Sequence, residues 1–273
     1  MYHELERAPR PLVSDAPGYV RYALAEADFR AHVAALGENG MRGVSVGETL
    51  GADDGDDVDQ RDGATEGDDA REGDDVREAG SRACLTFDDG CESDCLFAAP
   101  ILKDAGFNAT FYVVSDFVGR RGHLSAAQLR ELSDAGFEIG SHSRTHRYLD
   151  DLDGAGLRAE IVCSKERLEE ITGRRVEHFS CPGGRRTRRA AEVARAAGYR
   201  TLATSSPGVN ARATDPFNLR RVAVMRGTSA KEFLRLCRAE GLLRLRAQEA
   251  VLAAAKRVMG NAVYEKMRGA VLG

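Results

Sequence analysis

Short apolar runs alternate with amphipathic stretches along most of the chain. Runs of strand length occupy residues 43–46, 83–87, 109–114, 137–140, 176–179 and 200–203. The stretches between them carry apolar residues three or four positions apart, which predicts helices at 25–36, 96–105, 125–134, 157–171 and 187–197. Strands that alternate with helices predict βα units with right-handed crossovers and a parallel sheet.

A repeated junction supports this prediction. The helix-to-strand connections at 105–107, 135–137 and 197–199 each read Ala-Gly-aromatic. Glycine readily takes the left-handed conformation that ends a helix, and the aromatic residue then begins a buried strand. Polar motifs follow three of the predicted strands. A barrel, whose strand ends meet at one mouth, would bring those motifs together.

Length and composition are typical of a globular protein without a membrane span. The chain has 273 residues, 42% of them hydrophobic, and no apolar stretch approaches about 18 residues. Residues 1–7 lack the apolar core of a secretory signal, and six cysteines are too few for a disulfide scaffold, so we expect a cytoplasmic protein. Cys91 and Cys95 could bind a metal, but without a second pair they favour unpaired thiols.

Charge divides the chain unevenly. Residues 51–80 hold 13 Asp or Glu and 3 Arg, a net of −10, so the net −4 of the whole chain leaves +6 for the rest. This segment has almost no large apolar residue, which predicts a disordered acidic insertion. Its Gly-Asp-Asp repeats resemble calcium ligands but lack an ordered calcium loop, which favours a solvated spacer. We therefore expect an N-terminal part of the barrel (1–50), the insertion (51–80), a core (81–228) and basic C-terminal helices (229–273).

The C-terminal region carries the opposite charge. Residues 217–273 hold 12 Lys or Arg and 4 Asp or Glu, beside an apolar helix face. Helices packed on the barrel with solvated basic faces would explain this pattern. The alternative is peripheral contact with anionic lipid headgroups or a lipid-linked glycan at the inner membrane face. Nucleic acid is not an expected partner, because no aromatic residues interleave with the basic ones.

Two polar motifs indicate metal chemistry. Asp88 and Asp89 end a predicted strand, and adjacent carboxylates repel each other unless a cation divides their roles. His142 and His146 supply two imidazoles four positions apart. Mixed His and Asp ligands hold borderline divalent metals such as zinc, and a second carboxylate can then act as a base. Each motif alone also fits a turn or a solvated helix face, but their order along the chain favours a metal site.

Three motifs resemble those of a known family. The segments TFDDG (86–90), SHSRTH (141–146) and FSCPGG (179–184) are similar to the first three motifs of the polysaccharide deacetylases, also called the NodB-homology domain or carbohydrate esterase family four. The resemblance covers residues 19–233, with the acidic segment as an insertion. It implies an α/β fold, a distorted (β/α) barrel of the NodB-homology type, here with added C-terminal helices. It also implies an enzyme that removes acetyl groups from N-acetylated sugars of a polysaccharide or glycan intermediate.

The resemblance also implies roles for individual residues. Asp88 would be the general base, and a divalent metal, expected to be Zn²⁺, would be held by Asp89, His142 and His146. Three protein ligands leave positions open for water and the substrate carbonyl.

The third motif would contact the substrate. The backbone N–H of Gly183 would stabilise the oxyanion, although this motif also fits a simple tight turn. Pro182 would pre-set the turn that aims this amide, and Gly184 would complete the substrate-binding surface.

The chain departs from the family pattern in three ways. It has no Trp and no His after His178, so the late Leu-x-His that supplies the general acid is missing. Ser180 stands where the third motif has an Arg that pairs with the base. The segment 219–224 resembles the Leu-Pro-Arg-hydrophobic segment of shorter branches, so we hypothesise that Arg221 fixes the Asp88 carboxylate. His3 carries no signal, and the proton donor stays unassigned, since metal-bound water or the protonated Asp88 could serve.

These departures leave two other interpretations open. One is a hydrolase of another amide or ester on the same fold, because a fold does not fix a substrate. The other is a catalytically silent glycan-binding or partner-binding module.

Overall fold

The computed structural model describes residues 1–51 and 82–247 and shows the parallel α/β barrel that the sequence predicts. Five strands lie in the order β5-β6-β7-β8-β9, and all their pairings are parallel. Two shorter parallel pairs, β1-β2 and β3-β4, lie outside this sheet. The strands are β1 (Leu5–Glu6), β2 (Leu24–Ala25), β3 (Arg42–Val44), β4 (Arg82–Cys84), β5 (Thr86–Phe87), β6 (Thr110–Val113), β7 (Glu138–Ser141), β8 (His178–Ser180) and β9 (Thr201–Ala203).

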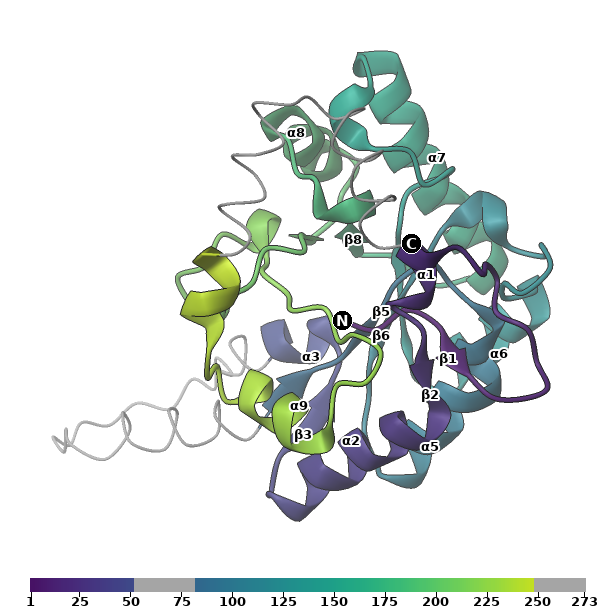
Figure 1. Cartoon of the computed structure of the whole chain (residues 1–273). Helices are drawn as coiled ribbons and strands as arrows, with labels where there is room; N and C mark the ends of the chain where they lie inside the picture. The colour runs from purple at the N-terminus through teal and green to yellow at the C-terminus, as the bar shows by residue number, and fades with distance from the viewer. Residues whose placement is uncertain (52–81, 248–273) are drawn as a thin grey trace, which may run out of the picture.

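Helices surround the strands (Figure 1). The α-helices are α1 (Pro17–Val20), α2 (Glu26–Glu38), α3 (Val46–Gly51), α5 (Ala99–Asp104), α6 (Ala126–Asp134), α7 (Gly154–Thr172), α8 (Arg188–Ala196) and α9 (Ala230–Cys237). Short turns of other helix types are η1 (Asp94–Ala98), η2 (Ser115–Phe117), η3 (Leu149–Asp151), η4 (Pro182–Gly184) and η5 (Pro216–Asn218). The predicted helix over 96–105 is therefore split into a π-helical turn, η1, followed by α5.

Local sequence signals explain several helix ends. The glycines of the three Ala-Gly-aromatic junctions, Gly106, Gly136 and Gly198, have φ values of 68°, 90° and 81°. The left-handed conformation expected there is thus confirmed. At the start of α6, Ser125 and Gln128 form a reciprocal capping box, which satisfies amides that would otherwise lack a partner.

Two short segments close the sheet at its edges. Tyr2 forms a parallel bridge with β5, and Leu219 forms one with β9. These segments then meet, because the amide of Val224 donates to the carbonyl of Met1 at 2.9 Å. The start of the chain consequently lies in the middle of the barrel, next to β5 and β6 (Figure 1).

Side chains alternate between the two faces of these strands. On the outer face, fully buried aromatic rings of β5, β6 and β8 belong to the main core beneath the helices. The ring of Phe87 stacks between Tyr2 and Phe111, with centroids 5.1 and 4.9 Å away. On the inner face, the Tyr112 ring packs against Gly140, where an added Cβ would lie 2.4 Å from the ring.

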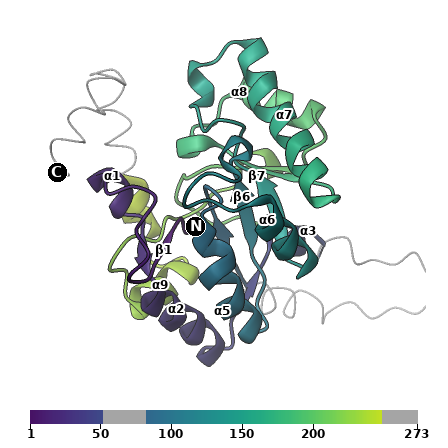
Figure 2. The ribbon, with the colours of Figure 1, turned by 90° about the vertical axis from the view of Figure 1, so that its right-hand side faces the viewer.

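The C-terminal helix α9 packs on α2. The His32 ring of α2 stacks on Phe233 of α9 at 4.5 Å, and Figure 2 shows the two helices side by side. The predicted acidic insertion and most of the predicted basic C-terminal helices lie outside the described residues, so the division of the chain stays a prediction.

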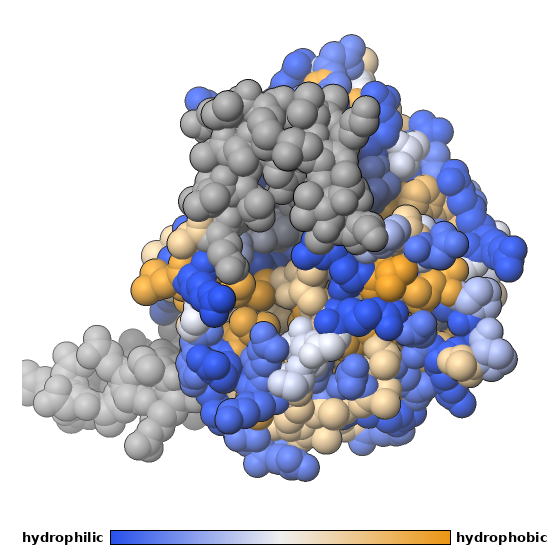
Figure 3. All heavy atoms as spheres, in the orientation of Figure 1, coloured by the Kyte–Doolittle hydropathy of each residue, from blue (hydrophilic) through white to orange (hydrophobic). Residues whose placement is uncertain are grey.

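The visible surface mixes hydrophilic and hydrophobic residues (Figure 3). Within the described ranges, no helix is both long and apolar enough to cross a membrane. All six cysteines fall within those ranges, and each is a free thiol.

Candidate active site

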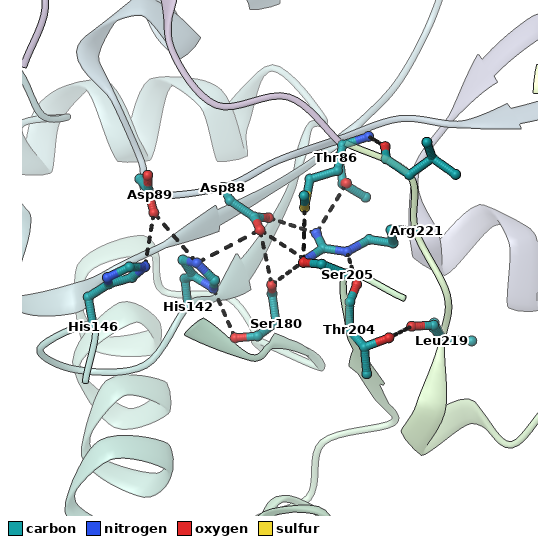
Figure 4. A network of polar contacts seen from close by, with 12 residues as sticks. Thr86, Asp88, Asp89, His142, His146, Ser180, Thr204, Ser205, Leu219 and Arg221 are labelled. Atoms are coloured by element: carbon teal, nitrogen blue, oxygen red, sulfur yellow. Dashed lines mark hydrogen bonds and ion pairs between the residues drawn. The ribbon is translucent and has the colours of Figure 1, made fainter. Parts of the chain in front are cut away.

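The first two motifs lie at the ends of two parallel strands of the sheet, β5 and β7, which are separated by β6. Asp88 and Asp89 follow β5, and His142 follows β7, so parallel pairing brings them to the same edge (Figure 4). The amide of Asp88 donates to the Tyr2 carbonyl, and the amide of His142 donates to the carbonyl of Val113. These backbone hydrogen bonds extend the strand pairing into the motifs and hold the Cα positions of Asp88 and His142 in place.

Three side chains form a cluster that could hold a cation. Ligand atoms of Asp89, His142 and His146 all lie within 4.8 Å of one another. Asp89 Oδ1 is 3.5 Å from Nε2 of His142 and 3.4 Å from Nε2 of His146. This oxygen is buried and accepts no hydrogen bond from the described part of the protein. Two imidazole nitrogens and one carboxylate oxygen suit a divalent transition metal, so the cluster fits a metal site.

His142 is oriented as a metal ligand. Its Nδ1 lies 2.9 Å from the carbonyl oxygen of Ser180, which requires Nδ1 to carry the proton and donate it. Nε2 is then free to bind a cation. Burial lowers the pKa of His142 to about 4, and the neighbouring His146 acts in the same direction, so the imidazole is neutral at pH 7.

The loops that carry the candidate ligands contain non-glycine residues in the left-handed backbone conformation. Asp89, Ser143 and His146 have φ values of 81°, 67° and 64°, although none of them is glycine. Among the described residues, only Ala239 shares this feature. Such strain persists where the surroundings enforce it, and it is common at functional sites.

A buried acid helps to enforce that loop conformation. Glu160 of α7, 5% exposed, accepts hydrogen bonds from the amides of Arg144 and Thr145 at 3.0 and 2.8 Å. Ser143 Oγ accepts a further bond from the amide of His146 at 3.1 Å. The sequence analysis missed Glu160 because a single Glu in a charged helix looks like an ordinary surface residue.

Arg221 lies against Asp88, as hypothesised. Its Nη1 and Nη2 donate to the two carboxylate oxygens of Asp88 at 2.7 and 2.9 Å (Figure 4). The remaining donors are also used, and their acceptors are the Thr204 carbonyl and the hydroxyls of Thr86 and Ser180. All five N–H groups of this buried guanidinium therefore have an acceptor. The bidentate pair leaves Asp88 little freedom to rotate.

The Arg221 guanidinium also controls the charge of Asp88. Burial alone would raise the pKa of this carboxyl, but Arg221, followed by His142, holds it well below its usual range. Asp88 is therefore ionised at neutral pH. Ser180 adds a hydroxyl that donates to Asp88 Oδ2 at 3.3 Å, so this residue of the third motif also belongs to the network.

The third motif forms a tight turn after β8. Pro182 is buried, and Gly183 and Gly184 have φ values of 61° and 68°. The amides of Gly184 and Arg185 close the turn by donating to the carbonyls of Cys181 and Pro182. The Gly183 N–H takes no part in these bonds. Its oxyanion role, and the substrate-binding roles of Pro182 and Gly184, stay predictions.

A third histidine near the acid pair was missed by the sequence analysis. The bridge between Tyr2 and β5 places His3 in register with Asp88. The His3 ring is half-buried and lies 4.7 Å from the Tyr22 ring, and its Nδ1 has no partner among the described residues. Burial lowers the pKa of His3, while the charges of Asp89 and Asp88 oppose this shift. A lone His within a two-residue pairing segment gives no periodic signal.

Comparison with known proteins agrees with this geometry. Residues 75–202 match the family model for polysaccharide deacetylase. The Bacillus subtilis protein YxkH, whose name places it among the polysaccharide deacetylases, is 30% identical over 149 residues, which cover 55% of this chain and 53% of that protein. The chain thus spans about half the length of the curated relative that it matches.

Solved structures share the fold. The Streptococcus pyogenes deacetylase PplD in complex with acetate superposes with a TM-score of 0.69 at 19% identity, over 86% of this chain and 95% of that one. The polysaccharide deacetylase BC0361 of Bacillus cereus gives 0.67 at 22% identity, over 86% and 67% of the two chains. At these identities the likeness shows the fold alone.

Proposed function

Since the chain belongs, through residues 75–202, to the polysaccharide deacetylase family, we propose that it is a metal-dependent hydrolase that removes acetyl groups from N-acetylated sugars of a glycan. The observation that carries the proposal is the cluster of Asp89, His142 and His146 beside a clamped Asp88. The acetate in the PplD structure is the product expected of such a reaction. The native metal is proposed to be Zn²⁺, from the nitrogen and oxygen donors of the cluster.

The chain's own residues account for most steps. When bound by Asp89 and the two imidazoles, a divalent cation supplies Lewis-acid chemistry that acidifies water and polarises a carbonyl. Asp88, ionised and held by Arg221, accepts the proton of the attacking water. The amide of Gly183 would donate to the oxyanion, and Pro182 and Gly184 shape the turn around it. His3, which lies in register with Asp88 beside β5, would protonate the leaving amine.

The direct test is acetate release by the full chain. We expect the purified protein to contain stoichiometric zinc and to release acetate from N-acetylglucosamine oligomers, with loss of activity on chelation and recovery on adding zinc. Hydrolysis of simple acetyl esters without action on the oligomers would support a different substrate class. Absence of both metal and hydrolysis would support a silent binding module and reject the proposal.

Replacing Arg221 with Met is expected to lower kcat/KM about 10- to 100-fold, because Asp88 loses both its orientation and its counter-charge. Without the guanidinium, burial raises the pKa of Asp88, so the acid limb of the pH profile should move to higher pH. The pH dependence of kcat/KM measures both effects. Arg220→Met, at the neighbouring exposed residue, is the control. Unchanged turnover in Arg221→Met would remove Arg221 from the mechanism.

Replacing His3 with Gln is expected to lower kcat on the amide substrate about 10²-fold or more, because a general acid contributes on this scale. The loss should be smaller on 4-nitrophenyl acetate, whose leaving group needs no proton. In the wild type, kcat/KM should fall as pH rises through the pKa of His3, which burial lowers from its ordinary value, and this fall should be absent in the variant. Equal losses on the two substrates would argue against proton donation.

The remaining predictions concern location. A cytoplasmic location at the inner membrane face, and contact of the basic C-terminal helices with lipid, stay predictions, since residues 248–273 of this region lie outside the described ranges.

A further inference from the structure

Tyr148 and Arg185 form an aromatic-cationic pair that the proposed mechanism does not use. Tyr148 follows the metal-ligand candidate His146 by two residues, and Arg185 directly follows the turn of the third motif. The guanidinium carbon of Arg185 lies 3.7 Å from the centroid of the Tyr148 ring. The pair therefore joins the two loops that carry the second and third motifs.

The Tyr148 ring is held from several directions. Arg185, whose side chain is 15% exposed, is fixed by an ion pair with Asp150 at 3.6 Å. The next residue along the chain, Leu149, is 1% exposed and anchors the loop in the main core. A ring fixed in this way loses little further conformational entropy when a ligand packs on it.

Gly183 provides the room for this ring. A Cβ added at Gly183 would lie 2.7 Å from Cε1 of Tyr148, closer than any side chain could tolerate. The glycine thus serves two purposes, since its φ of 61° also disfavours other residues. The Tyr148 ring consequently packs directly against the turn that is proposed to stabilise the oxyanion.

The ring is also half-exposed, so part of it can meet a ligand. A second aromatic-cationic pair lies near the site: the guanidinium carbon of Arg120 is 4.7 Å from the Phe117 ring centroid, and the Phe117 ring is 6.3 Å from the His146 ring. The Phe117 ring therefore already contacts a candidate metal ligand, whereas the Tyr148 ring has no such contact among the described residues. Aromatic side chains offer apolar contact area with little flexibility, and the C–H face of a pyranose ring is complementary to such a surface. The chain contains no Trp to do this.

We propose that Tyr148 is a specificity-determining residue that positions a pyranose ring of the glycan beside the metal site, and that Arg185 is a positioning residue that holds the Tyr148 ring. This inference rests on the proposed function, because it concerns the substrate of the same site.

The test compares Tyr148→Ala and Tyr148→Phe with the wild type, all zinc-loaded and of verified metal content, on the N-acetylglucosamine pentamer. Tyr148→Ala is expected to raise KM about five- to tenfold, with kcat within about twofold of the wild type. Tyr148→Phe keeps the ring and should stay close to the wild type. Arg185→Met should raise KM less than Tyr148→Ala. Arg167→Gln, an exposed arginine of α7 paired with Glu170, is the matched control.

Three results would overturn the inference. KM could be unchanged in Tyr148→Ala, or Tyr148→Phe could be as impaired as Tyr148→Ala, which would implicate the hydroxyl. A fall in kcat at constant KM would show instead that the ring only supports the Gly183 turn.

Failure of the proposed function can be distinguished from failure of this inference. If the wild type releases no acetate, binding of the pentamer is measured by calorimetric titration. Pentamer binding by the wild type that weakens in Tyr148→Ala retains the inference, whereas no binding, or equal affinity in the two proteins, rejects it.

Discussion

An Asp88→Asn variant is expected to keep its metal and to release acetate about 10³-fold more slowly than the wild type. The amide has nearly the same shape as the carboxylate but cannot accept the proton of the attacking water. Asp88 itself is not among the three ligand candidates, so zinc should remain bound. The measurement is kcat on N-acetylglucosamine oligomers beside the zinc content of the same preparation.

Two controls make this result specific. The amide leaves one donor of the buried Arg221 poorly matched, so thermal unfolding must show that the variant is folded. Asp134→Asn, at an exposed acid of α6 that pairs with Arg174, should behave as the wild type. Loss of zinc from Asp88→Asn would mean that Asp88 is itself a ligand, and full activity would exclude it as the base.

A His142→Ala variant is expected to lose both zinc and acetate release, down to the level of the chelated wild type. The substitution removes one of the three donors that the described residues bring together, and the imidazole is the one oriented for binding by its hydrogen bond to the Ser180 carbonyl. Metal content after dialysis and acetate release together measure this effect.

His123→Ala is the matched control for that variant, because this half-buried histidine lies outside the cluster. It should retain zinc. A His142→Ala protein that still bound one zinc ion per chain would show that the cation, and with it the hydrolytic mechanism, depends on other residues.

The parts of the fold that sequence predicts are those set by local signals. The Ala-Gly-aromatic junctions predicted three helix ends correctly, and α6 begins directly after Ser125, at the start of the predicted helix over 125–134. Sequence alone also predicted that the two acids, Asp88 and Asp89, lie near the two histidines, His142 and His146. The prediction was possible because each pair follows a strand of the same parallel sheet.

The parts that sequence does not predict depend on contacts between distant segments. His3 reaches the acid pair only because Tyr2 bridges β5, a pairing too short to leave an alternating pattern. Arg221 could be suggested from its motif, but its five acceptor atoms come from three separate segments of the chain, at residues 86–88, 180 and 204. The π-helical turn η1 inside a predicted helix likewise has no signal in the apolar periodicity.

The left-handed backbone at Asp89, Ser143 and His146 bears on how much change the rest of the molecule can absorb. Each such residue costs about 1–3 kcal/mol, against a typical total stability of about 5–15 kcal/mol for a folded domain. The net stability already includes this cost, so the contacts around the three residues must offset it. Glycine at Ser143 would relax the loop, but it would also remove the hydroxyl that accepts a hydrogen bond from the His146 amide.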